Sequence, residues 1–200
     1  MTRKSFAKAL DEALRPLGFS RTGDDWIRVR GQMWDCVHRH SSWLGGVTVE
    51  LYQKDLETEK LYLEIFAPRG AIQMPATDAA IGQLIDGNSR WWTKDDPDGP
   101  ADMASAVLKY GLPWFDRVGT LEEQAANWYG RDQALSVRGY HGRSLVGLAL
   151  TLYRMGQITE ACRVLGKPVP KTAIPASVED VRWVRAWLGC PALDADVVAS

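Results

Sequence analysis

The chain has 200 residues, of which 46% are hydrophobic and 24% charged, and its net charge at pH 7 is −1. This composition is typical of a globular protein with a proper buried core. The charge argues against a nucleic-acid partner, and no apolar run reaches the length of a membrane span. Residues 1–10 contain basic side chains but no apolar signal segment, so we expect a cytoplasmic protein.

The first predicted element is an amphipathic helix over residues 3–17. One apolar stripe follows its length, formed by Phe6, Leu10, Leu14 and Leu17. We expect this stripe to cover one face of a sheet.

Residues 24–66 then predict four β-strands in sequence, because apolar and polar residues alternate with period two. The connections are too short for crossover helices, which favours antiparallel pairing. The strands are expected at residues 26–30, 33–41, 47–52 and 61–66. The second of these does not alternate cleanly, so its core-facing side stays open.

The other strands each have an aliphatic face and a mixed face. We expect the aliphatic face to be buried, namely Ile27, Val29, Val47, Val49, Leu51, Leu61, Leu63 and Ile65. The opposite face would then carry aromatic and charged side chains, namely Trp26, Arg28, Arg30, Glu50, Tyr52, Tyr62, Glu64 and Phe66.

Helical patterns dominate the rest of the chain. They predict helices at residues 77–86, 101–110, 120–129, 143–155, 157–165 and 177–188. The fold class is therefore α+β, with an antiparallel four-stranded meander packed by helices on one face. We expect a sheet domain at residues 1–118 and a helical region at 119–200 that packs on or beside it.

Three short motifs occur together in the first 120 residues: Leu17-Gly18-Phe19, Trp91-Trp92, and the run Tyr-Gly-Leu-Pro-Trp-Phe-Asp at residues 110–116. In this order they resemble a family of bacterial proteins catalogued as a domain of unknown function. Members commonly have a glutamine and a serine near the end of the second strand, where this chain has residues 38–42. The resemblance implies an α+β fold and a bacterial origin, and no activity.

Chemistry-bearing residues are few. Cys36, Cys162 and Cys190 are far apart, odd in number and without a C-x-x-C pair, which argues against a disulfide framework or a structural zinc site. His38 and His40 share a strand face with Cys36, and Glu50 or Glu64 could approach them. This arrangement leaves open a metal site or a His-Glu acid–base pair, although solvated histidines explain it more simply.

No nucleophile elbow and no phosphate-binding glycine motif is present. We therefore expect no catalytic residue, no metal and no cofactor. The leading interpretation is a non-catalytic protein-binding module, with an immunity or antitoxin role as one version. Arginine and aromatic side chains are enriched in binding hot spots, so the expected contact residues are Trp26, Arg28, Arg30, His38, His40, Glu50, Tyr52, Tyr62, Glu64, Trp91 and Trp92.

Two other interpretations stay open. One is a small-ligand or metal-binding protein, or an enzyme, that uses the His and Glu side chains of the sheet. The other is a subunit of a larger assembly that associates through its C-terminal helices. A further uncertainty is whether those helices cover the mixed face of the sheet.

Overall fold

The computed structural model describes residues 5–67, 76–135, 141–167 and 175–192. The chain forms two compact units. The sheet unit consists of Met1–Lys54 and Thr77–Gly119, and the helical unit of Asp55–Ala76 and Thr120–Ser200.

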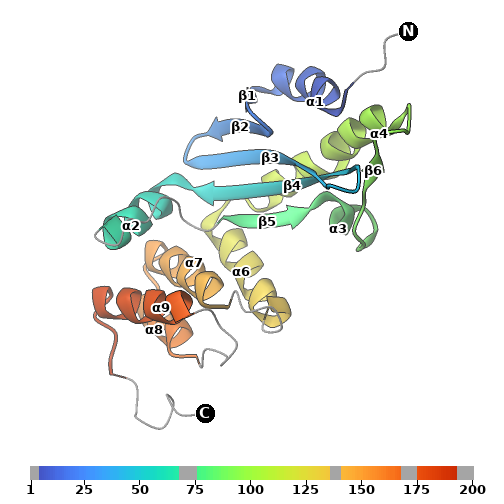
Figure 1. Ribbon diagram of the computed structural model, residues 1–200. Helices are drawn as coiled ribbons and strands as arrows, with labels where there is room; N and C mark the ends of the chain where they lie inside the picture. The colour runs from blue at the N-terminus through green and yellow to red at the C-terminus, as the bar shows by residue number, and fades with distance from the viewer. Residues whose placement is uncertain (1–4, 68–75, 136–140, 168–174, 193–200) are drawn as a thin grey trace. The chain divides into compact units, whose positions relative to one another are not determined.

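The described part of the sheet unit contains a six-stranded sheet, in which the antiparallel α+β prediction is confirmed and the count of four strands is wrong. The order of the strands is β1-β2-β3-β4-β5. Strand β6 is outside this order and pairs with β4. Figure 1 shows β2, β3 and β4 running alongside one another. The bounds are β1 Ser20–Thr22, β2 Asp25–Arg30, β3 Met33–Ser41, β4 Gly46–Asp55, β5 Thr77–Ala80 and β6 Trp92–Thr93.

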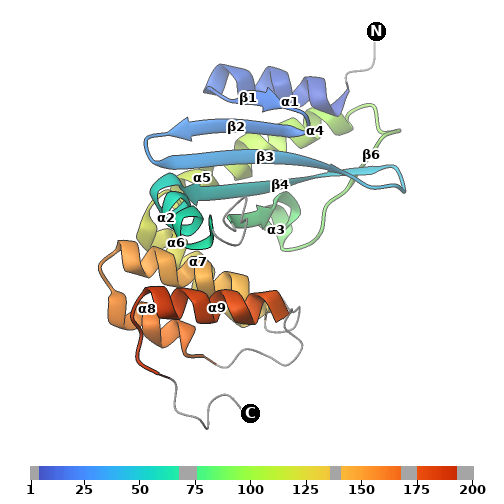
Figure 2. The ribbon, with the colours of Figure 1, turned by 60° about the vertical axis from the view of Figure 1, so that its left-hand side comes forward.

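Helix α1 (Phe6–Leu14) confirms three members of the predicted apolar stripe, because Phe6, Leu10 and Leu14 are buried, whereas Leu17 lies beyond the helix and is 39% exposed. Ser5 caps it by accepting a hydrogen bond from the Lys8 amide at 3.2 Å. A 3-10 turn, η1 (Arg15–Leu17), follows. Figure 2 shows α1 and α4 (Gly99–Ala106) lying against one face of the sheet.

The helical segment that begins with α4 continues through a π turn, η3 (Val107–Gly111), into α5 (Leu112–Arg117). The predicted helix at 77–86 is wrong in its first half, which forms β5, whereas α3 (Ile81–Asp86) occupies the second half. The core of this unit includes Leu10, Trp26, Val37, Val49, Leu51, Met103 and Phe115.

The predicted face of β2 is inverted. Trp26 is buried and pairs with Val37, whereas Val29 is 58% exposed. The indole N–H of Trp26 donates to the Asp11 carboxylate at 2.7 Å, so the ring can be buried without leaving its donor unpaired. On β4 the predicted aliphatic face is confirmed, because Val47, Val49 and Leu51 are buried.

The predicted fourth strand at 61–66 is wrong, because these residues belong to α2 (Leu56–Phe66). Asp55 caps this helix and accepts hydrogen bonds from the Thr58 amide and hydroxyl, both at 2.7 Å. Leu61 and Ile65 are spaced by four as well as lying on one alternating face, so their pattern fits either element. The hydrogen bonds to Asp55 at the helix N-terminus favour the helix over the strand.

The helical unit packs α2 with α6 (Leu121–Leu135), α7 (His141–Arg154), α8 (Ile158–Leu165) and α9 (Pro175–Trp187). Figure 1 shows α7, α8 and α9 side by side. Its core includes Phe66, Trp128, Leu148, Val164 and Val184.

A disulfide joins Cys162 to Cys190 in the helical unit, with their Cα atoms 5.4 Å apart. The count and spacing of the cysteines argue against a disulfide framework, but they do not exclude this single bond. With three cysteines at least one thiol must stay unpaired within the chain, but the other two can still form a bond. Cys36 is that free, buried thiol.

Candidate functional site

The turn between β3 and β4 exposes two large apolar side chains. The Ser42 amide donates to the Gly46 carbonyl at 2.8 Å, and the Gly45 amide donates back to the Ser42 carbonyl at 3.0 Å. Gly45 has φ of +90°, which favours glycine. This closed turn directs Trp43 and Leu44 into solvent, where they are 90% and 75% exposed.

Trp91 lies beside this turn, because it directly precedes β6, and β6 pairs with the start of β4 through Gly46–Thr93 and Val47–Trp92. Its ring meets His40 edge-on, with the ring centroids 5.8 Å apart. A Cβ atom on Gly46 would lie 3.0 Å from the Trp91 ring, so the glycine permits the close approach. Trp91 nevertheless remains 47% exposed. We name His40, Trp43, Leu44 and Trp91 the hairpin-tip patch.

A polar pocket of about 420 Å³ adjoins the patch, and Trp91 forms part of its wall. Inside it Arg90 pairs with Asp102 at 2.6 Å, and the indole N–H of Trp92 donates to the same carboxylate at 2.7 Å. The Trp92 and Arg90 contacts lower the pKa of Asp102. The Arg90 charge is thus balanced locally.

Two further carboxylates line the same pocket. Asp86 accepts from the Asn88 amide at 3.0 Å, and Asp96 accepts from the Asp98 amide at 2.9 Å. In both contacts the donor is a neutral backbone amide and not a cation. The surface next to the hairpin-tip patch is therefore acidic.

A second cluster lies on the sheet face that carries His38. The Nδ1 atom of His38 is 2.6 Å from the Asp25 carboxylate, and the Cys36 thiol donates to the same oxygen at 3.7 Å. Burial, followed by the nearby Asp25, raises the pKa of the Cys36 thiol well above its usual range. Cys36 is therefore a protonated thiol and a poor nucleophile or metal ligand.

Tyr52 lies against the same histidine, with the rings of Tyr52 and His38 6.3 Å apart. Its hydroxyl donates to Glu50. Burial and the Glu50 bond raise the pKa of Tyr52, which keeps the phenol protonated. Over the described ranges, no three His, Cys, Asp or Glu side chains are grouped as a metal would need.

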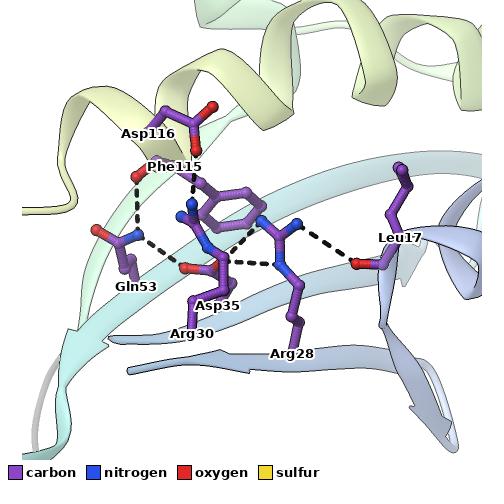
Figure 3. A network of polar contacts seen from close by, with 7 residues as sticks. All are labelled: Leu17, Arg28, Arg30, Asp35, Gln53, Phe115 and Asp116. Carbon is purple, nitrogen blue, oxygen red and sulfur yellow. Dashed lines mark hydrogen bonds and ion pairs between the residues drawn. The ribbon is translucent and has the colours of Figure 1, made fainter. Parts of the chain in front are cut away.

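Arg28 and Arg30, both predicted as contact residues, take part in a network of polar contacts around the fully buried Asp35 (Figure 3). One Asp35 oxygen accepts from Arg28 at 2.8 Å and from Arg30 at 2.7 Å. The other accepts from the Gln53 amide at 2.7 Å. These bonds satisfy a charge that would be costly to bury alone.

The network also ties the sheet to α5. Gln53 donates to the Phe115 carbonyl at 2.9 Å, and Arg30 donates to Asp116 at 2.6 Å. Figure 3 shows these residues converging from β2, β3, β4 and α5. Arg28 and Arg30 are therefore both bonded to carboxylates within the sheet unit.

The structure distributes the other expected contact residues over several places. Trp26 is in the core, Trp92 is buried under the pocket, and only His40 and Trp91 reach the hairpin-tip patch. His38, Glu50 and Tyr52 share one sheet face. Tyr62 and Glu64 are on α2 and not on a strand.

Trp43 and Leu44 are not among the contact residues expected from the sequence. The available signal was an apolar pair placed directly before Gly45-Gly46 in a hairpin turn, where polar residues are usual.

No family model, no curated protein and no solved structure matches the chain. Within the described segments, none of the helices combines the length and the apolar character needed to cross a membrane.

Proposed function

We propose that this chain is a non-catalytic protein-binding module whose contact surface is the hairpin-tip patch. The observation that carries the proposal is the exposure of Trp43, at 90%, next to Leu44 and Trp91. Large apolar residues gathered on a surface are typical of interaction sites, and Trp is the residue most enriched in binding hot spots.

The turn that carries Trp43 supports the proposal. Hydrogen bonds between Ser42, Gly45 and Gly46 hold its backbone, so the side chain is presented from a closed loop. A pre-organised anchor loses less entropy on binding than a mobile one. The fitting partner is a protein with an apolar pocket for the indole and basic side chains opposite Asp86 and Asp96. We expect no nucleic-acid partner.

The test is affinity capture with the wild type, Trp43→Ala and Val29→Ser, followed by calorimetry on each purified candidate. Val29 is a matched control, because it is an exposed apolar residue of the same unit outside the patch. We expect one partner that binds the wild type and Val29→Ser equally and loses at least tenfold in affinity with Trp43→Ala. If every captured partner binds Trp43→Ala with the same affinity as the wild type, the proposal is contradicted.

An immunity or antitoxin role is the version that we consider first. It follows from the small size, the resemblance to a bacterial family and the absence of catalytic motifs in the sequence. A cytoplasmic location is part of the same proposal. Disulfides such as Cys162–Cys190 are rare in that compartment, so differential alkylation of the three cysteines in rapidly quenched cells tests it.

The second candidate is an enzyme or small-ligand binder that uses His38, His40 and Glu50. The 2.6 Å contact between Asp25 and His38 favours it, because a carboxylate on Nδ1 orients the ring and leaves Nε2 for a substrate. A His38→Ala, His40→Ala double variant, together with metal analysis, tests this role. If no metal copurifies and the variant matches the wild type in every assay, this candidate fails.

A further inference from the structure

A second cavity, of about 430 Å³, lies within the helical unit. Its volume is within the usual range for small-molecule sites. Its walls come from α8 and from the end of α9 and the residues that follow, and the apolar part of the wall is formed by Ile158, Leu188, Pro191 and Ala192.

Arg185 is the group that gives this cavity its charge. Its guanidinium donates to the Cys162 carbonyl at 3.2 Å and to the Pro191 carbonyl. Through the described part of the chain, no carboxylate forms an ion pair with it. Burial lowers the pKa of Arg185. Two carbonyl dipoles do not cancel a full positive charge, so an anion would be stabilised here.

Arg163, the other cation of the lining, is already neutralised. Its guanidinium forms two hydrogen bonds to Glu160, to which Tyr129 also donates at 2.5 Å. These contacts lower the pKa of Glu160 to about 2, so the pair stays ionised at neutral pH. Among the described residues of the lining, the uncompensated charge is therefore that of Arg185.

The disulfide fixes the wall around this charge. Cys162 lies on α8, and its partner Cys190 lies just beyond the end of α9 at Trp187. The bond therefore joins the two sides of the cavity, and Pro191 directly follows it. A cavity held in this way needs little reorganisation to receive a ligand.

We infer that this cavity binds a small monocarboxylate with an apolar tail, its carboxylate on Arg185 and its tail against Ile158, Leu188 and Pro191. Arg is well matched to a carboxylate, because its planar N–H groups can bind both oxygens. The apolar wall excludes a highly charged anion in favour of an amphiphile. This site is separate from the hairpin-tip patch, so its test does not depend on the contact surface proposed above.

The test measures binding of octanoate to the full chain by calorimetry, with octanamide and acetate as probes that lack the charge or the tail. We expect octanoate to saturate one site and to bind at least tenfold more tightly than either control. Equal binding of octanoate and octanamide would show an apolar cavity with no carboxylate selection and overturn the inference.

Two variants assign the site. Arg185→Gln should weaken octanoate binding at least tenfold, whereas Arg182→Gln, on an exposed residue of the same helix outside the cavity lining, should change it less than twofold. Ile158→Asp places a negative charge at the edge of the cavity. Because Ile158 is 48% exposed and begins α8, this change should leave the fold intact and still weaken octanoate tenfold.

If Arg185→Gln fails to fold, Ile158→Asp alone tests whether octanoate binds in this cavity. Octanoate binding that is unchanged by Ile158→Asp would overturn the site.

Discussion

In the sheet unit the buried carboxylate of Asp35 meets two guanidinium groups and an amide, whereas in the helical unit the guanidinium of Arg185 meets two carbonyl oxygens. The first arrangement balances its charge, and the second leaves a positive charge beside a cavity. The sheet unit also exposes two large apolar side chains to solvent, Trp43 at 90% and Leu44 at 75%. The two units thus offer different chemistry: an exposed apolar patch on the sheet unit and a charged cavity in the helical unit.

Removing Asp35 should have the largest effect on the sheet unit. Asp35→Ala leaves Arg28 and Arg30 without their shared buried partner, and breaking such a pair costs about 3–5 kcal/mol. Urea unfolding measures the loss. Asp116→Ala is the control, because Asp116 also binds Arg30 but is 68% exposed, and we expect less than about 1 kcal/mol. Equal losses for the two variants would show that burial is not the cause.

Removing the disulfide should have the next largest effect and should act on the helical unit. The bond closes a loop with a sequence separation of 28 residues, which corresponds to about 3.5 kcal/mol of lost stability in the chain-entropy model. Cys190→Ser should therefore raise hydrogen exchange in α7, α8 and α9, measured by mass spectrometry. The Cys162→Ser, Cys190→Ser double variant should be no less stable than the single one, since the bond is lost only once.

Glu160 gives the helical unit a smaller, pH-dependent contribution. Hydrogen bonds from Arg163 and Tyr129 lower its pKa from 4.5 to about 2 in the folded state. The stabilisation is therefore complete above pH 4.5 and is lost as pH falls towards 2. Since the pair is at the surface, we expect about 1 kcal/mol or less.

Glu160→Gln tests this contribution by urea unfolding across that pH range. The variant should be less stable than the wild type at pH 6, and the two should converge near pH 2. A difference that stays constant with pH would show that ionisation of Glu160 is not involved.

The sequence predicts the elements whose pattern is local. The stripe of Phe6, Leu10 and Leu14 and the alternation of Val47 and Val49 are each read correctly, because one face of each element packs into the core. The predictions fail where a single polar contact determines the type of an element or the face that it buries. The Asp55 cap turns 61–66 into a helix, and the Asp11 acceptor lets Trp26 rather than Val29 face the core.

The candidate sites depend on contacts that are distant in sequence. His40 meets Trp91 only because β6 pairs with the start of β4, and that pairing does not follow from any local pattern. Arg185 and Cys162 are likewise brought together by the packing of α8 and α9. Residue types could therefore suggest His40 and Trp91 as contact residues, but they could not group them with Trp43.

Trp43 should show the smallest effect on stability and the largest on binding. With 90% of its side chain exposed, Trp43→Ala removes little buried area, so we expect a change within about 0.5 kcal/mol in urea unfolding. Gly46→Ala provides the complementary variant, because its Cβ would press on Trp91 and displace it without altering Trp43. If the hairpin-tip patch acts as one surface, both variants weaken the same partner. If only Trp43→Ala does so, the indole alone is the anchor and Trp91 serves the wall of the acidic pocket.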